Sequence, residues 1–124
     1  MKHNANILIV DDQVDNQLLL SDFLEALGYG YSVASNGKQA LELFIENNFD
    51  MILMDLEMPV MNGVETTVYI RTHFKGAKAN TPIVAITAHC PYDYQEKYSK
   101  KGFSDFLSKP YTIDKIESTI HKFL

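Results

Sequence analysis

Cysteine is almost absent from this chain of 124 residues, which contains only Cys90. A single thiol excludes an intramolecular disulfide and any zinc cluster built from several cysteines. Long hydrophobic runs are absent too, since no stretch reaches the roughly 18 apolar residues of a membrane-spanning helix. The first six residues contain no apolar signal core. These absences lead us to expect a soluble, cytoplasmic protein that does not enter a membrane.

Clusters of basic residues are also missing. The chain has 11 Lys and Arg against 16 Asp and Glu, for a net charge of −5, and its one adjacent basic pair is Lys100-Lys101. Nucleic-acid surfaces are built on clustered basic side chains, so we expect no nucleic-acid partner. The hydrophobic fraction of 46% and the length of the chain are typical of one globular domain, which we place at residues 1–124.

Five strand-like runs alternate with five helical patterns along the chain. The runs are short and apolar, as in Ile7–Val10, Met51–Met54 and Ile83–Ile86. Continuous apolar runs of this length, bounded by turn signals, are typical of strands buried on both faces of a parallel sheet. The alternation therefore predicts an α/β fold of the form βαβαβαβαβα, with helices on both faces of a five-stranded sheet.

Local signals predict where several helices begin and end. The first helix should start near Asp12, which can cap it, and end before Gly28, with Val14 and Leu18 in its apolar stripe. Asn36 and Asn62 each begin a capping-box pattern, and Thr112 should cap the last helix. These signals predict the second helix after Asn36, the third from Asn62 to about His73, and the fifth after Thr112.

The fourth helix, expected from Pro91 to about Gly102, has the weakest pattern. Residues 92–101 include three tyrosines but no aliphatic side chain, so little apolar area would hold this helix to the sheet. Two interpretations stay open: an ordinary exposed helix, or a movable element whose tyrosines face a partner.

Polar residues of different chemistry follow four of the predicted strands. Asp11 and Asp12 follow the first, Asp55 ends the third, Thr87 ends the fourth and Lys109 follows the fifth. In open parallel sheets, ligands bind beyond the carboxyl ends of the strands, so these side chains should converge at one edge. Three carboxylates suit Mg²⁺, and a backbone carbonyl such as that of Glu57 could complete its shell.

Asp55 is the candidate nucleophile of this site, because a carboxylate can attack phosphorus to give an aspartyl phosphate. Lys109 precedes Pro110, which favours a constrained turn that can contain a cis peptide bond. The ammonium of Lys109 suits a phosphate oxygen, and the hydroxyl of Thr87 could donate a hydrogen bond to one. Together these residues predict a phosphorylation site.

The same motifs resemble the receiver domain of two-component response regulators. They are Ile-Leu-Ile-Val-Asp11-Asp12, Met-Asp55-Leu-Glu-Met-Pro-Val-Met-Asn-Gly63, Ile-Thr87-Ala88 and Leu-Ser-Lys109-Pro110. The resemblance covers the whole chain, with the motifs in the family's order and spacing. Within the family, the motif sequences are most similar to those of receivers of hybrid sensor histidine kinases.

This resemblance implies a flavodoxin-like (βα)₅ fold and a phosphorylation-dependent signalling switch. Asp55 would accept a phosphoryl group from a phosphohistidine on a sensor kinase or phosphotransfer protein, with Mg²⁺ held by Asp11, Asp12 and Asp55. Lys109 would contact the phosphoryl group and Thr87 would respond to it. The domain would assist its own phosphorylation and dephosphorylation without being an enzyme for another substrate.

Three further positions take roles from the resemblance. Phe106 would be either a switch aromatic or a core residue, and both interpretations stay open. Glu57 and His89, at the rim, would tune the lifetime of the aspartyl phosphate. A downstream protein would bind the face formed by the fourth helix, the fifth strand and the fifth helix, on or near which we expect Tyr94, Tyr98, Phe106 and Tyr111.

Two other functions use related chemistry. A phosphatase that forms an aspartyl phosphate would carry a second acid where Glu57 stands, but it would also need a substrate cap, for which 124 residues leave no room. A flavin or nucleotide module would need a phosphate-binding loop rich in Ser, Thr or Gly after the first strand. The sequence there is Asp11-Asp12-Gln13, which would repel a phosphate in the absence of a metal.

Overall fold

A single parallel sheet of five strands forms the centre of the molecule, with the strand order β2-β1-β3-β4-β5. The computed structural model describes residues 4–58, 60–88 and 96–124. The strands are β1 (Asn6–Val10), β2 (Gly30–Ala34), β3 (Met51–Asp55), β4 (Ile83–Thr87) and β5 (Asp105–Ser108). All four strand pairs are parallel, as the sequence predicts.

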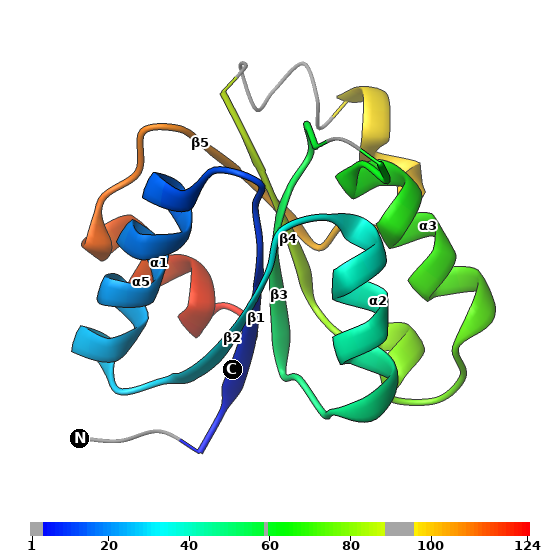
Figure 1. Cartoon of the computed structure of the whole chain (residues 1–124), viewed down its shortest axis with the longest axis horizontal. Helices are drawn as coiled ribbons and strands as arrows, with labels where there is room; N and C mark the ends of the chain where they lie inside the picture. The colour runs from blue at the N-terminus through cyan, green and yellow to red at the C-terminus, as the bar shows by residue number, and fades with distance from the viewer. Residues whose placement is uncertain (1–3, 59, 89–95) are drawn as a thin grey trace.

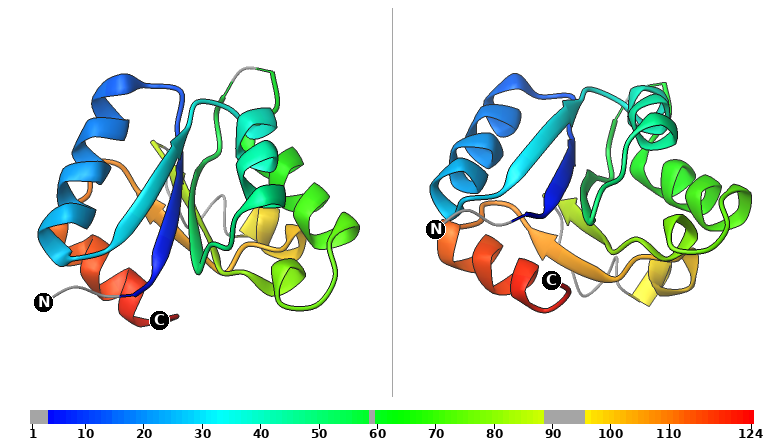
Figure 2. Two further views of the ribbon diagram at one scale, coloured as in Figure 1. Left: turned by 60° about the horizontal axis from the view of Figure 1, so that its bottom comes forward. Right: turned by 90° about the horizontal axis from the view of Figure 1, so that it is seen from below.

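Helices cover both faces of the sheet (Figure 1). They are α1 (Val14–Leu27), α2 (Gly37–Glu46), α3 (Gly63–His73) and α5 (Ile113–His121), with short 3₁₀ turns η1 (Lys78–Asn80) and η2 (Ser99–Lys101). Helices α1 and α5 lie on one face, and α2 and α3 lie on the other (Figures 1 and 2). The expected three-layer α/β architecture is therefore confirmed.

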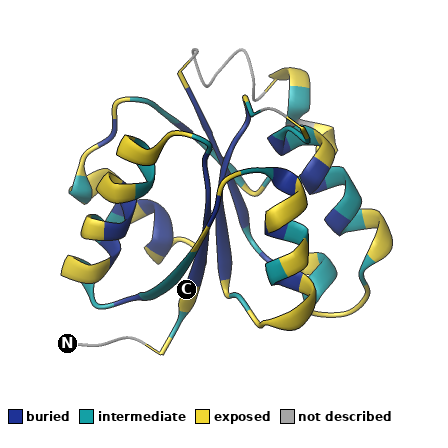
Figure 3. Cartoon of the chain, in the orientation of Figure 1, coloured by how far each residue is buried: buried dark blue, intermediate teal, exposed yellow. Residues whose placement is uncertain are grey.

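Two apolar cores lie on opposite faces of the sheet, and the strands alternate their side chains between them. Ile7 and Ile9 of β1 point into the core under α1 and α5, while Leu8 and Val10 point into the core under α2 and α3. Every residue of β3 and β4 is buried (Figure 3). This explains why these strands are continuous apolar runs and why only their ends carry polar side chains.

The helix boundaries follow the predicted signals at most ends. Asn62 and Glu65 form a complete capping box at the start of α3, and Thr112 caps α5. Asn36 accepts a hydrogen bond from the backbone of Gln39, as expected for α2. Gly28 ends α1 at φ 87°, a left-handed conformation that glycine adopts without strain.

The start of α1 differs from the prediction. The helix begins at Val14 and its N-cap is Gln13, so Asp12 does not cap it. The carboxylate of Asp12 belongs instead to the acidic cluster described below. Val14 and Leu18 were expected in the buried stripe but are 63% and 58% exposed. The stripe that α1 buries is narrower than the sequence pattern and contains Leu20, Ser21 and Leu24.

The predicted fourth helix lies partly outside the described residues, which omit 89–95. Residues 96–98 are helical, and η2 continues them to Lys101. Arg71 of α3 anchors the turn that follows, since its Nε donates to the carbonyl of Gly102 at 2.9 Å and its Nη1 donates to the carbonyl of Ala79 at 2.9 Å. One half-buried guanidinium thus ties α3 to two loops on the same side of the sheet.

Among the described residues, no helix is both long enough and apolar enough to cross a membrane.

Candidate functional site: an acidic cluster at the carboxyl edge of the sheet

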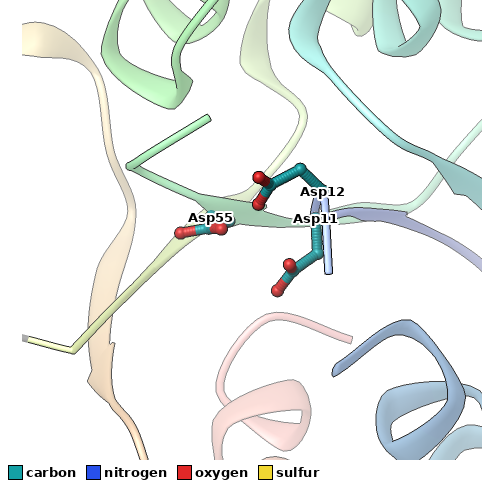
Figure 4. A group of neighbouring side chains, drawn as sticks. All are labelled: Asp11, Asp12 and Asp55. Atoms are coloured by element: carbon teal, nitrogen blue, oxygen red, sulfur yellow. The ribbon is translucent and has the colours of Figure 1, made fainter. Parts of the chain in front are cut away.

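Three carboxylates meet where β1 and β3 end, as the sequence predicts. Asp11 and Asp12 follow β1 and Asp55 is the last residue of β3, and one carboxylate oxygen from each lies within 4.8 Å of the others (Figure 4). The two strands are paired neighbours, with Val10 opposite Met54. The register of the sheet itself therefore brings the three side chains together.

Lys109 supplies the positive charge of this site from the end of β5. Its Nζ lies 3.7 Å from Asp11 Oδ2 and 3.7 Å from Asp55 Oδ1. The backbone N–H of Lys109 donates to the carbonyl of Thr87 at 2.8 Å, which ties the lysine to the end of β4. The Lys109-Pro110 peptide bond is cis, in keeping with the predicted turn.

Asp55 is only 4% exposed, and its surroundings make its charged form costly. The pKa of this carboxyl is raised to about 6, chiefly by burial and also by the charges of Asp11 and Asp12, while the backbone N–H of Glu57 and the ammonium of Lys109 act in the opposite direction. The N–H of Glu57 donates to Asp55 Oδ1 at 3.2 Å. The Asp55 carboxylate is thus held by this hydrogen bond and by the ion pair with Lys109.

The donor set fits a hard divalent cation. Three carboxylates packed this closely repel one another, and Mg²⁺ binds oxygen ligands of this kind. The buried Oδ2 of Asp11, whose other oxygen accepts from the N–H of Gln13 at 2.9 Å, has no hydrogen-bond partner among the described residues. A bound cation with its waters would satisfy that oxygen and neutralise the cluster.

Thr87 and Glu57 face each other beside the cluster. Thr87 is fully buried at the end of β4, and its hydroxyl donates to Oε1 of the exposed Glu57 at 3.5 Å. Sequence reasoning placed both residues at the site but did not predict this contact. His89 lies outside the described residues.

The aromatic residues expected on the partner-binding face divide into two groups. Phe106 is half-buried in β5 and packs against Phe103, with ring centroids 5.3 Å apart, and Tyr98 is also half-buried. Tyr111 does not lie on that face: it is 8% exposed and packs edge-on against Phe23 of α1. Tyr111 belongs to the core under α1 and α5. Tyr94 lies outside the described residues.

A glycine behind the nucleophile was not singled out from the sequence. A Cβ at Gly63 would lie 2.3 Å from the carbonyl oxygen of Asp55 and 2.9 Å from Leu56 Cα. The first turn of α3 thus packs directly on the backbone that carries Asp55. The sequence Asn62-Gly63 at the start of α3 could have indicated this close approach, but the same dipeptide is also compatible with an ordinary helix start.

Comparison with known proteins assigns the chain to a family. The family model for the response regulator receiver domain matches residues 7–121. The chain belongs to this family, whose members are receiver domains of two-component and phosphorelay signalling systems. This membership favours the receiver over the phosphatase and the flavin or nucleotide module.

Curated relatives include regulators and hybrid kinases. The chain is 35% identical over 116 residues to two-component response regulator 24 of Arabidopsis thaliana, covering 93% of this chain and 81% of that protein. It is 35% identical over 109 residues to hybrid signal transduction histidine kinase I of Dictyostelium discoideum, covering 84% of this chain and 6% of that protein. The chain thus spans a small fraction of some relatives and most of others.

Solved structures show the same fold. The receiver domain of a Pseudomonas aeruginosa sensor histidine kinase, described with a magnesium ion coordinated in its active-site cleft, has a TM-score of 0.87 at 29% identity, covering 98% of each chain. The receiver domain of a Saccharomyces cerevisiae response regulator, solved with a histidine phosphotransfer protein, has a TM-score of 0.88 at 31% identity, covering 99% of this chain and 90% of that one.

Proposed function

We propose that this receiver domain is a phosphorylation switch in which Asp55 is the phosphoacceptor and Mg²⁺ is bound by Asp11, Asp12 and Asp55, with the backbone carbonyl of Glu57 as a further ligand. The observation that carries the proposal is the cluster of three carboxylates with Lys109 Nζ at 3.7 Å from both Asp11 and Asp55. The proposed domain is the whole of residues 1–124, and it acts in the cytoplasm without a nucleic-acid partner.

In the proposed reaction, an oxygen of Asp55 forms a bond to phosphorus while the P–N bond of a phosphohistidine breaks, and the electron pair leaves on the imidazole nitrogen. When bound, Mg²⁺ neutralises charge on the phosphoryl oxygens. Lys109 turns its ammonium from the carboxylates toward a phosphoryl oxygen. In the later hydrolysis, promoted by the same residues, water attacks phosphorus, the bond to the Asp55 oxygen breaks, and inorganic phosphate leaves with the carboxylate restored. The domain thus assists both its phosphorylation and its dephosphorylation.

The new phosphoryl group brings a charge of about −1.5 to −2 and three strong acceptor oxygens. Thr87 leaves Glu57 and donates its hydroxyl to one of these acceptors, which draws the end of β4 inward. Phe106, in the adjacent β5, responds to that movement. Glu57 and His89 tune the lifetime of the phosphoryl group, and the face made by the fourth helix, β5 and α5 presents the change to a downstream protein.

The partner that donates the phosphoryl group is a histidine kinase or a histidine phosphotransfer protein. Three exposed apolar residues support this, Val14, Leu18 and Val60, with exposures of 63%, 58% and 79%. Val14 and Val60 lie within five residues of a cluster carboxylate along the chain, and Val60 has φ 71°, a strained conformation for a β-branched residue. Exposed apolar side chains this near the site along the chain are suited to a partner that must exclude water from the transfer.

Intact mass after incubation with Mg²⁺ and acetyl phosphate tests the proposal. We expect one added phosphate that is stable in acid and labile in base, as for an acyl phosphate. The adduct should be absent from Asp55→Asn and absent when EDTA replaces Mg²⁺. Asp50→Asn is the matched control. Asp50 is an exposed carboxylate that immediately precedes β3, at the opposite end of that strand from Asp55, so its replacement should not affect labelling. An adduct that persists in Asp55→Asn would contradict the proposal.

A further inference from the structure

Tyr111 carries a buried hydroxyl that its packing role does not require. The side chain is 8% exposed, and its hydroxyl oxygen has no hydrogen-bond partner among the described residues. The ring packs edge-on against Phe23, with centroids 6.3 Å apart and planes at 72°. A phenylalanine would fill the same space without the cost of removing a hydroxyl from water. Tyrosine at this position therefore calls for a polar partner.

Two features of the structure link Tyr111 to the acidic cluster. Tyr111 follows Lys109 by two residues, and it shares its core with Ile9, which precedes Asp11 by two residues. Burial raises the pKa of Tyr111, and the negative charges of Asp11 and Asp55 raise it further. Tyr111 is therefore linked to the cluster through its sequence neighbour Lys109, which pairs with Asp11, and through the core that it shares with Ile9.

A matching acceptor is present on Asp11. This residue is 1% exposed, and while its Oδ1 accepts from the backbone N–H of Gln13, its Oδ2 is buried without a hydrogen bond. The ammonium of Lys109 lies 3.7 Å from Oδ2, beyond hydrogen-bonding distance. A buried donor on Tyr111 and a buried acceptor on Asp11 thus both lack a hydrogen bond among the described residues. Leaving both unpaired costs more than joining them.

We propose that Tyr111 is a positioning residue for the cation site: its hydroxyl is joined to Asp11 Oδ2 by a hydrogen-bonded buried water and fixes the orientation of that carboxylate. The inference rests on the proposed function in taking the cluster as a Mg²⁺ site. An oriented carboxylate binds a cation more tightly than one that rotates, because less freedom is lost on binding. Tyr111 acts through Asp11 and touches neither the cation nor the phosphoryl group.

Mg²⁺ affinity measured by isothermal titration calorimetry at pH 8 tests the inference. We expect Tyr111→Phe to weaken Mg²⁺ binding about tenfold, the lower end of the effect seen when a hydrogen-bond partner of a metal ligand is lost. Tyr29→Phe is the matched control. Tyr29 is 7% exposed in the same core, but it precedes β2 and therefore lies at the amino ends of the parallel strands, away from the acidic cluster at their carboxyl ends. The control should bind Mg²⁺ within about twofold of the parent chain.

A double-mutant cycle provides a readout that does not involve the metal. Urea unfolding in EDTA is compared for Tyr111→Phe, Asp11→Asn and the double variant. We expect the effects not to add, since once Asp11 is replaced the hydroxyl has lost its charged acceptor. Additive effects, or a Tyr111→Phe variant with raised stability and unchanged Mg²⁺ affinity, would overturn the inference by showing a hydroxyl that is merely unpaired.

The two proposals fail in different ways. If the parent chain binds Mg²⁺ but takes no phosphate at Asp55, the proposed function is wrong while the titrations still decide the role of Tyr111. If the parent chain is phosphorylated and Tyr111→Phe matches it in Mg²⁺ affinity, only the inference about Tyr111 is wrong.

Discussion

Asp55 faces two opposed requirements within one side chain. A nucleophilic carboxylate has to be charged and sparsely hydrogen-bonded, yet this one is buried next to two other carboxylates. Its pKa of about 6 reflects that conflict. The proposed site resolves it only when a cation is bound, so the free protein carries an unfavourable charge at neutral pH.

Asp55→Asn should therefore stabilise the protein in the absence of Mg²⁺. Because the native pKa of the carboxyl lies above its usual value, the native state keeps a proton that the unfolded state loses between pH 4 and 6. Stability thus falls as pH rises through this range, and the penalty is complete above pH 7. Urea unfolding in EDTA should show the variant more stable by about 1–3 kcal/mol at pH 8 and by less at pH 5.

Two controls accompany this prediction. Asp22→Asn removes an exposed carboxylate of α1 and should change stability by less than about 0.5 kcal/mol at either pH. Mg²⁺ should reduce the difference between the parent and Asp55→Asn at pH 8, because the cation binds the charged carboxylate. An Asp55→Asn variant that is less stable at pH 8 than the parent in EDTA would contradict the electrostatic account.

At the level of elements, α3 holds the loop beyond β3 against the sheet. Gly63 makes this possible, because the first turn of α3 touches the carbonyl of Asp55 and the Cα of Leu56. The capping box of Asn62 and Glu65 fixes the start of the helix at that contact. The nucleophile is thus positioned by a helix end as well as by its own strand.

Gly63→Ala should destabilise the protein by about 2–3 kcal/mol, although alanine is the better helix former. A Cβ at this site would press on the backbone of Asp55, so the rate of phosphorylation by acetyl phosphate should fall as well. Urea unfolding and intact mass measure the two effects. Gly76→Ala is the comparison: Gly76 has φ +65° with open space around it, so its cost of about 1 kcal/mol comes from backbone conformation alone.

Equal losses of stability in the two glycine variants would contradict the steric argument. So would a Gly63→Ala variant that is destabilised but phosphorylated at the parent rate, since the contact would then matter for folding and not for the position of Asp55.

At the scale of the molecule, α1 carries three exposed apolar side chains, Val14, Leu18 and Leu19, which are 63%, 58% and 41% exposed. Leu18→Asp should leave stability and labelling by acetyl phosphate unchanged, since the side chain is 58% exposed. Phosphotransfer from a phosphohistidine protein should slow at least tenfold, because a desolvated apolar contact is replaced by a charge. The measurement is transfer of labelled phosphate from the cognate kinase or phosphotransfer protein.

Ile45→Asp is the matched control for Leu18→Asp. Ile45 is 59% exposed on α2, on the other face of the sheet, and its replacement should not affect transfer. Slowing of labelling by acetyl phosphate in Leu18→Asp would show damage to the site itself and contradict a docking role.

Much of the architecture was predictable because buried parallel strands are continuous apolar runs. The same runs indicated which polar residues would converge, and the structure brings Asp11, Asp12, Asp55 and Lys109 together as expected. The exposure of Val14 and Leu18 was not predictable, because an apolar residue at helical spacing looks the same whether it packs on a sheet or faces a partner. Burial of Tyr111 was missed for a related reason, since its packing against Phe23 depends on how α1 crosses the sheet.

The strand order has a consequence for how the molecule is made. The first 55 residues contain all three carboxylates and the adjacent strands β1 and β3, whereas Lys109 follows the last strand. A ribosome therefore releases the negative half of the site well before its positive half. We expect β5 to dock last, with the ammonium of Lys109 attracted by the negative charges of the cluster. The final stage of folding should then be faster in dilute salt than in concentrated salt, which screens that attraction.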